Sequence, residues 1–215
     1  HRFFMKITYA ITVKDEFIEI QRLISHLLKL KRYKDEIVVL YDQKNGDNEI
    51  ALYLTKLMKL PNVQFWRGYF DGDFSVWKNQ LSEYCSGDYI FQIDADEIPN
   101  TNLISSLPSI IEMNPENDVF LVPRVNTVDG LTDEHIKEWR WNVNEDGWVN
   151  WPDYQWRIWK NIPTIKWVNK VHEKLDGFKT FSPLPEEEDF SLSHPKDIKR
   201  QERQNNFYND LMNGH

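Results

Sequence analysis

Short apolar runs alternate with amphipathic stretches over the first hundred residues of the chain. Four runs rich in β-branched and aromatic side chains predict buried strands, at residues 5–13, 36–41, 63–66 and 89–93. Between these runs apolar residues recur at helical spacing and predict amphipathic helices, at residues 17–30, 49–59 and 74–85. This order of strands and helices predicts an α/β fold with a mostly parallel central sheet and helices on both faces.

The pattern becomes less regular after Pro99. A helix broken by Pro108 is expected at residues 102–113, and strand-like runs follow at residues 119–125, 154–160 and 165–171. Residues 183–189 predict a loop, and residues 197–212 predict a charged terminal helix with few large apolar side chains, which should pack loosely. We therefore expect one domain over residues 1–215, consisting of a parallel half at 5–99, a second half with a smaller β region at 100–195, and a C-terminal helix at 196–215.

Three carboxylates follow directly on the strand predicted at residues 89–93. Asp94, Asp96 and Glu97 come at once after the apolar run, and Pro99 prevents the strand from continuing. Two carboxylates a few ångströms apart repel, so a cation is expected beside them. Oxygen ligands favour a hard divalent ion such as Mg²⁺ or Mn²⁺, which in turn suits a phosphate-bearing substrate. The alternative is that these acids line a solvated turn.

Polar residues follow three of the four predicted strands, including the strand at residues 89–93. They occur at residues 14–16, 42–45 and 94–97. In sheets of this kind ligands bind outside the carboxyl ends of the strands, so these three groups should converge on one edge. Asp71 and Asp73 form a second pair of carboxylates, but a helix begins just after them, so we interpret Asp73 as a helix N-cap.

Composition excludes several classes of protein. The formal net charge of −8 argues against a duplex nucleic-acid binder, and no apolar run is long enough to span a membrane. Cys85 is the only cysteine, which excludes an internal disulfide and cysteine-cluster metal sites and favours a cytoplasmic, reducing compartment. Residues 1–4 precede Met5, so we expect them to be an addition to the natural chain, and the sequence to be part of a longer protein.

Several motifs together resemble family 2-like glycosyltransferases of the GT-A fold, a Rossmann-like nucleotide-binding fold. The motifs lie at residues 12–16, 41–43, 73–80, 87–97, 156–161 and 167–173, in the order in which the family carries them. The resemblance covers residues 5–194 and extends to glycosyltransferases of chlorella viruses that act on the capsid glycan. The sequence departs from the family's pattern at Lys78, where the family usually has arginine, and at Asn169, near a position that is usually glycine. Lysine is a point charge, so the first departure weakens the expectation of a bidentate phosphate contact.

The resemblance implies a metal-dependent hexosyl-type transferase that uses a nucleotide-sugar, most simply a UDP-sugar, with Mn²⁺ or Mg²⁺ and no organic cofactor. The acceptor would be a hydroxyl of a glycan or glycoprotein. Residues 5–99 would be the nucleotide-sugar-binding half and residues 100–195 the acceptor-side half. Asp96 would hold the metal, and Asp94 would contact the ribose or the metal. The other nucleotide-sugar contacts would come from Thr12, Val13, Lys14, Glu16, Asp42, Lys78 and Ala95.

The same resemblance implies roles for residues further along the chain. Glu173 resembles the acid that removes the acceptor proton, and His172 beside it is the second catalytic candidate. His194 resembles a third metal ligand, and either histidine could take that role. Each of these three side chains could instead be a structural hydrogen-bonding group.

Seven of the nine tryptophans lie at residues 139–167. Sugar rings stack on aromatic faces, so Trp151, Trp156 or Trp159 could form an acceptor platform, but large side chains are equally needed to fill a core. We expect most of the seven to be core residues. Two other classes of protein would also use acids and tryptophans: a lectin-like module with a structural Ca²⁺, which is usually all-β, and a metal-independent glycosidase.

Overall fold

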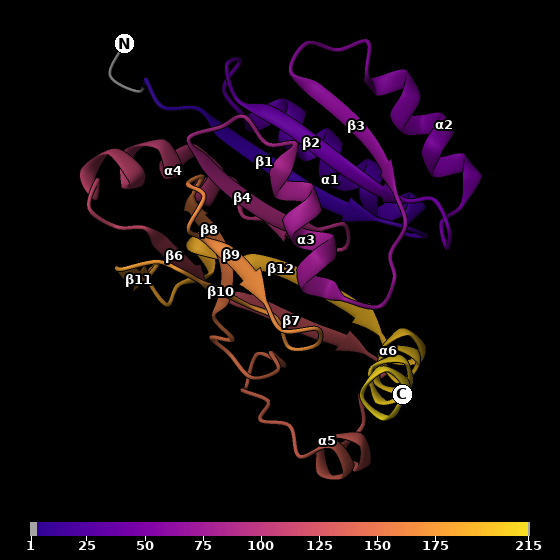
Figure 1. Ribbon diagram of the computed structural model, residues 1–215. Coiled ribbons are helices and arrows are strands. Elements are labelled where there is room, and N and C mark those ends of the chain that lie inside the picture. Colours follow the sequence, from indigo (N-terminus) through magenta and orange to yellow (C-terminus); the bar gives the residue numbers. More distant parts are fainter. Residues whose placement is uncertain (1–3, 215) are drawn as a thin grey trace.

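The computed structural model describes residues 4–214 and is organised around a seven-stranded sheet with the order β11-β6-β8-β4-β1-β2-β3 (Figure 1). Four strands from the first half of the chain are parallel to one another: β1 (Ile7–Val13), β2 (Glu36–Asp42), β3 (Val63–Gly68) and β4 (Tyr89–Asp94). The sheet is completed by β8 (Gln155–Lys160), which is antiparallel to β4 and β6 (Val119–Val122), and by β11 (Phe181–Pro183), which is parallel to β6. The predicted α/β fold with a mostly parallel sheet is confirmed.

Helices cover both faces of the sheet because alternate strand residues face opposite cores. Tyr9 and Phe91 belong to the core under α1 (Phe17–Leu30), α2 (Asn48–Leu57) and α4 (Thr101–Met113). Their strand neighbours Ala10 and Ile90 belong to the core under α3 (Phe74–Glu83). Strands buried on both faces read as continuous apolar runs, which is why the sequence pattern located them.

Two prolines act differently from the prediction. The helix expected to break at Pro108 continues through it, and Pro108 lies on the buried face of α4 with Leu107 and Ile111. The strand expected at residues 119–125 instead divides at Pro123 into β6 and β7 (Arg124–Asp129). β7 then joins a separate three-stranded sheet with β5 (Ile98–Pro99) and β12 (Leu192–Asp197), neither of which the sequence pattern predicted.

The strand expected at residues 165–171 is shorter in the structure. Only β9 (Lys166–Val168) forms, paired with β10 (Lys174–Asp176). Asn169 and His172 have φ angles of 78° and 55°, in the left-handed region, so the chain turns between the two strands. The predicted loop at 183–189 leads into a short 3₁₀ helix (Glu188–Phe190), and α5 (Asp133–Trp139) is a further helix that the pattern did not predict.

The C-terminal helix α6 (Ile198–Asn213) follows β12 directly and contains no buried residue, as its composition predicted (Figure 1). Cys85 lies in the core with Leu81 and Ile90, and burial raises the pKa of its thiol. Over residues 4–214, no helix has the length and apolar character that crossing a bilayer requires. The expectation for the start of the chain concerns residues 1–4, of which residues 1–3 lie outside the described residues.

Candidate functional site

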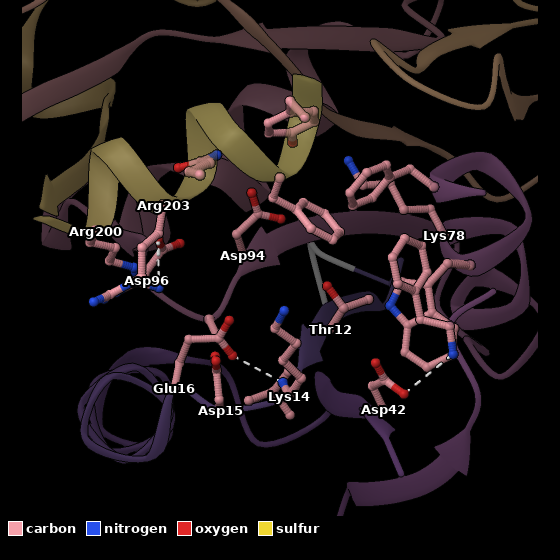
Figure 2. A pocket seen from close by; sticks show the side chains of 18 of the residues that line it. Thr12, Lys14, Asp15, Glu16, Asp42, Lys78, Asp94, Asp96, Arg200 and Arg203 are labelled. Carbon is pink, nitrogen blue, oxygen red and sulfur yellow. Dashed lines mark hydrogen bonds and ion pairs between the residues drawn. The ribbon is translucent and has the colours of Figure 1, made fainter. Parts of the chain in front are cut away.

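A cavity of about 410 Å³, the central cavity, opens at the carboxyl ends of β1, β2 and β4 (Figure 2). Parallel pairing places Thr12 of β1 opposite Asp94 of β4, so the loops after these strands meet there. The predicted convergence is confirmed, because all of the residues expected to contact a nucleotide-sugar line this cavity: Thr12, Val13, Lys14, Glu16, Asp42, Lys78, Asp94 and Ala95.

A second cavity of about 280 Å³, the inner cavity, adjoins the first and shares Asp94, Asp96 and Glu173 with it. The acceptor-side candidates meet in this inner cavity: His172, Glu173, His194 and Trp156 line it. The two cavities therefore bring together the carboxylates after β4 and the polar residues of the second half of the chain.

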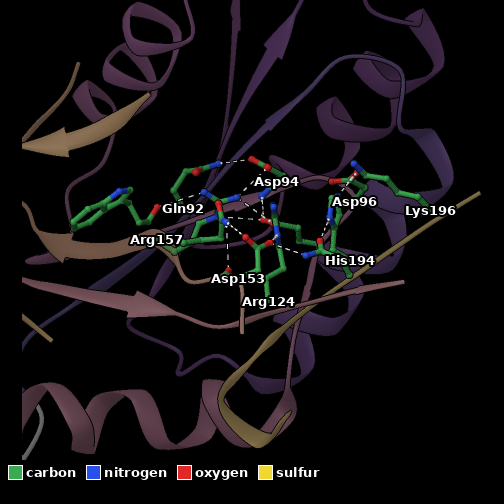
Figure 3. Close-up of polar contacts among 12 residues, drawn as sticks. Gln92, Asp94, Asp96, Arg124, Asp153, Arg157, His194 and Lys196 are labelled. Atoms are coloured by element: carbon green, nitrogen blue, oxygen red, sulfur yellow. Dashed lines mark hydrogen bonds and ion pairs between the residues drawn. The ribbon is translucent and has the colours of Figure 1, made fainter. Parts of the chain in front are cut away.

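A buried network of charges fixes the segment that follows β4 (Figure 3). Glu97 is fully buried and accepts hydrogen bonds from Arg157 Nη2 and Arg124 Nη1, both at 3.1 Å. Glu97 Oε1 also accepts from the backbone N–H of Asp94 at 2.9 Å. Arg157 Nη2 donates in addition to Asp94 Oδ2 at 3.1 Å. Glu97 thus acts as a structural anchor that holds both arginines and the Asp94 backbone in place.

These arginines decide the charge state of Asp94. Burial alone would raise the pKa of the Asp94 carboxyl, but the charge of Arg157, and after it that of Lys78, outweighs burial, and the pKa falls well below its usual range. Asp94 is therefore ionised and held by Arg157 and by Gln92 Nε2, which donates to Oδ1 at 3.0 Å. Sequence reasoning missed Arg157, although a charged residue inside an aromatic strand is a signal that it needs a buried partner.

Asp96 does not contact the arginines that hold Asp94 and Glu97. Its carboxylate contacts two other side chains, one cationic and one that can become cationic. His194 Nε2 lies 3.0 Å from Asp96 Oδ2, and Arg200 Nη2 of α6 lies 3.2 Å from the same oxygen. Burial would raise the pKa of the Asp96 carboxyl, but His194 and Arg200 together outweigh burial, and the pKa is lowered. His194 was predicted as a partner of this motif, whereas Arg200 was not.

The hydrogen bonds around Asn126 determine which nitrogen of His194 carries its proton. Asn126 Nδ2 donates to Asp153 Oδ2 at 2.6 Å, so Asn126 Oδ1 faces His194 Nδ1 at 2.8 Å and must accept from it. His194 Nε2 faces Asp96 Oδ2 at 3.0 Å. A neutral ring with its proton on Nδ1 has a lone pair there, so this contact needs a second proton or a metal ion between the two atoms. A histidine supported through one nitrogen and facing a carboxylate with the other has the arrangement typical of a metal ligand.

The donor set for a divalent ion is smaller than predicted. Within residues 4–214 there is no cluster of three or more His, Cys, Asp or Glu side chains arranged to hold a metal. Each carboxylate is paired with an arginine, Asp94 with Arg157 and Asp96 with Arg200, but only Asp96 also faces a second candidate metal ligand, His194. Mg²⁺-like ions are commonly bound by one or two protein ligands together with substrate phosphates and water, and these two side chains fit an ion of that kind.

Lys78 lines the central cavity but is already paired with a carboxylate. It is buried, its Nζ donates to Glu173 Oε1 at 2.6 Å, and it lies 4.2 Å from the centre of the Trp167 ring. In this structure the lysine positions Glu173, and its contact with a diphosphate stays a prediction. The same ion pair holds the Glu173 carboxylate at the boundary of the two cavities.

Other acids near the central cavity have local roles. Asp73 is confirmed as the N-cap of α3, because its Oδ1 accepts from the backbone N–H groups of Ser75 and Val76. Asp42 is buried and accepts from the turn that follows β2, including the backbone N–H of Lys44 at 3.1 Å. Glu16 accepts from the Lys14 backbone at 3.0 Å, and burial raises the pKa of Glu16 to about 7.

The three tryptophans proposed for an acceptor platform lie in different places. Trp156 borders the inner cavity. Trp159 is only 2% exposed and packs edge-on against Trp167, so it is a core residue and the platform prediction is wrong for it. Trp151 packs against Trp148 and borders neither the central nor the inner cavity. His172 stacks on Tyr208 of α6, with 6.2 Å between the ring centres.

Comparison with known proteins finds a matching family and solved structures with a similar fold. The model of the family described as "Glycosyl transferase family 2" matches residues 8–182. The structure of S. aureus TarS 1–349 has a TM-score of 0.53 at 16% identity and covers 73% of this chain and 47% of that chain. The same TarS fragment with UDP has a TM-score of 0.50 at 19% identity, covering 60% of this chain and 38% of that chain. Its complex with UDP-GlcNAc also has a TM-score of 0.50 at 19% identity, covering 60% and 36% of the two chains.

These likenesses show that the fold is the GT-A fold. No curated protein matches the sequence. The chain spans less than half the length of the TarS structures that it resembles.

Proposed function

This chain belongs to glycosyl transferase family 2, and on that premise we propose that it transfers a sugar from a nucleoside diphosphate sugar, a UDP-sugar in the first instance, to a hydroxyl group of a glycan. The observation that carries the proposal is the facing pair of Asp96 and His194 at the carboxyl end of β4, beside a cavity of about 410 Å³. Residues 5–99 would form the nucleotide-sugar-binding half and residues 100–195 the acceptor-side half.

The donor would lie in the central cavity, with its nucleoside toward Thr12, Glu16 and Asp42. Asp96 and His194 would hold Mn²⁺ or Mg²⁺. A bound divalent ion neutralises the charge that develops on a leaving diphosphate. Asp94, kept ionised by Arg157, would accept a hydrogen bond from the ribose. Since the protein supplies only two metal ligands, the phosphates of the nucleotide-sugar should supply others, and the ion and the nucleotide-sugar should bind together.

The acceptor would enter through the inner cavity, where Glu173 is the best-placed base. As the acceptor oxygen bonds to the anomeric carbon, the bond from that carbon to the diphosphate oxygen breaks, and the acceptor proton passes to the Glu173 carboxylate. Lys78 fixes the position of that carboxylate at 2.6 Å. His172 lies beside Glu173 and stacks on Tyr208, so we propose that it shapes the acceptor entrance.

The acceptor and the biological setting are proposed from the sequence resemblance alone. Because the motifs resemble glycosyltransferases of chlorella viruses, we propose a glycan of a capsid protein as acceptor and the host cytoplasm as the place of action.

Isothermal titration of UDP with and without Mn²⁺ tests the donor assignment. We expect UDP binding that Mn²⁺ strengthens, and a loss of about a hundredfold in the Mn²⁺-dependent affinity for Asp96→Ala, since a direct ligand should matter at least as much as a supporting one. Asp71→Ala, which removes an exposed acid outside the cavity, is the matched control. A lectin-like module would ignore UDP under both conditions, and a glycosidase would act in the presence of a chelator.

A second experiment isolates the chemical step. Glu173→Gln keeps the size of the side chain but cannot accept the acceptor proton, so UDP affinity should be retained while transfer falls by about 10²–10⁴-fold. Retained turnover in a folded Glu173→Gln protein would remove Glu173 as the base and leave the donor assignment standing.

A further inference from the structure

The C-terminal helix α6 forms one wall of the central cavity, although none of its residues is buried. The residues that it contributes are spaced one helical turn apart and so share one face: Arg200, Arg203, Gln204, Phe207 and Tyr208. In globular proteins such a face normally packs on a core. Here Tyr208 stacks on Phe74, but the face also borders an open volume of about 410 Å³, in which a ligand could add to its packing.

Cationic side chains around the central cavity differ in whether a carboxylate already neutralises them. Lys78 is paired with Glu173 at 2.6 Å, and Arg200 is paired with Asp96 at 3.2 Å and Glu19 at 3.3 Å. Arg203 is exposed and makes no hydrogen bond or ion pair with any residue from 4 to 214.

Lys14 lies across the cavity from α6, in the loop after β1. Its ammonium group is 5.3 Å from the centre of the Phe207 ring, and it forms no ion pair with the described part of the chain. Cation–π contacts of this kind do not neutralise the charge. Arg203 and Lys14 are therefore the two cations at this cavity that remain available for an anion.

The acids of the cavity make these two cations necessary. Six carboxylates line it: Asp15, Glu16, Asp42, Asp94, Asp96 and Glu173. These carboxylates repel an anionic ligand unless it lies against cationic side chains that are not already paired with a carboxylate. Arg203 is one helical turn beyond Arg200, which touches Asp96, so its guanidinium group lies on the side of the cavity where Asp96 lies (Figure 2).

We propose that Arg203, with Lys14 opposite, binds the diphosphate of the donor, and that ligand binding thereby fixes α6 as a wall of the site. This inference rests on the proposed function and assigns to Arg203 a diphosphate contact of the kind that the sequence suggested for Lys78. A guanidinium group can donate two parallel hydrogen bonds to a phosphate, which a lysine cannot.

Titrations with UDP, UMP and uridine on three proteins test the proposal: the wild type, Arg203→Ala, and Lys199→Ala as the matched control. Lys199 is an exposed cation of the same helix that lines neither the central nor the inner cavity. We expect Arg203→Ala to weaken UDP binding about tenfold to a hundredfold, because the variant loses a charged hydrogen bond to the phosphates. Uridine has no phosphate, so its binding should be unchanged. Lys199→Ala should bind all three ligands as the wild type does.

Amide hydrogen exchange provides a second, structural readout. UDP should slow exchange in residues 198–208 of the wild type, and this protection should be lost in Arg203→Ala. If Arg203→Ala binds UDP as tightly as the wild type, the diphosphate assignment is overturned while the proposed function stands. A wild-type protein that binds neither UDP nor GDP, with or without Mn²⁺, would overturn both.

Discussion

The two walls of the central cavity are built in different ways. On the sheet wall, the strands beneath Thr12, Asp42 and Asp94 are buried, and a network of fully paired charges holds the loop after β4. On the opposite wall, α6 places charged and aromatic side chains toward the same space without burying any of them. The contrast teaches that one wall is positioned by folding alone, whereas the other, on our proposal, gains stability when a ligand binds between them.

Removing the buried cation of the sheet wall should have the largest effect. Arg157→Ala leaves Glu97, which is fully buried, with one cation instead of two, and leaves Asp94 without its arginine. Breaking a buried ion pair from one side typically costs about 3–5 kcal/mol. Urea unfolding should show a loss of that size, whereas Arg203→Ala on the α6 wall should change the free energy of unfolding by less than about 0.5 kcal/mol. Equal effects of the two substitutions would contradict the contrast between the walls.

The next effect concerns the support behind His194. Asn126→Ala removes the acceptor of the His194 Nδ1 proton at 2.8 Å and frees the ring to rotate. Loss of such a supporting hydrogen bond typically weakens metal binding about tenfold to a hundredfold. Electron paramagnetic resonance of free Mn²⁺, titrated at a fixed UDP concentration, measures this directly. Asn209→Ala, an exposed change on α6, is the control, and unchanged Mn²⁺ affinity in Asn126→Ala would show that Asn126 does not orient the ligand.

A smaller effect depends on pH and on Glu16, which lies between the two walls. Burial raises the pKa of Glu16 to about 7 from its ordinary value of 4.5, and the charges of Asp15 and Asp96 raise it in the same direction. Between pH 4.5 and pH 7 the folded protein holds a proton on Glu16 that the unfolded protein has released. The contribution of protonated Glu16 to the free energy of unfolding is therefore complete below pH 4.5 and is lost as the pH rises through 7.

Glu16→Gln should abolish that loss. Thermal melts in a chelating buffer should therefore show the variant gaining on the wild type as the pH rises, at no more than about 1.4 kcal/mol per pH unit. A difference between the two proteins that does not change from pH 5 to pH 8 would contradict the assignment.

The smallest effect is expected at the helix cap of α3, which lies outside both walls. Asp73→Ala removes the acceptor for the backbone N–H groups of Ser75 and Val76, which should cost about 1 kcal/mol in urea unfolding. The affinity for UDP should stay the same. A loss of UDP binding at constant stability would mean that Asp73 belongs to the site after all.

The sequence predicted the sheet wall far better than the rest of the molecule. Buried parallel strands are continuous apolar runs, and the residues after them are brought together by the parallel order alone, so Thr12, Asp42 and Asp94 could be assigned to one edge. The strand β12 escaped prediction because Ser193, His194, Pro195 and Lys196 are not typical strand residues. Its position depends on pairing with β7, about seventy residues away in the chain.

The charge network and the cations of α6 could not be predicted for a related reason. The pairing of Glu97 with Arg124 and Arg157 depends on the packing of β4, β7 and β8, and no local pattern records it. Arg200 and Arg203 lie in a helix whose weak apolar face correctly predicted loose packing. Its position over the cavity follows only from the direction in which β12 ends.

Cys85 gives this protein a useful experimental property. It is the only cysteine in the chain, and because it is buried with a raised thiol pKa it should react slowly with maleimides at neutral pH. A cysteine introduced at Asn209 would then be the one position that accepts a fluorescent label, with no need to replace Cys85. The emission of such a label could follow, in real time, how quickly α6 responds when a nucleotide arrives.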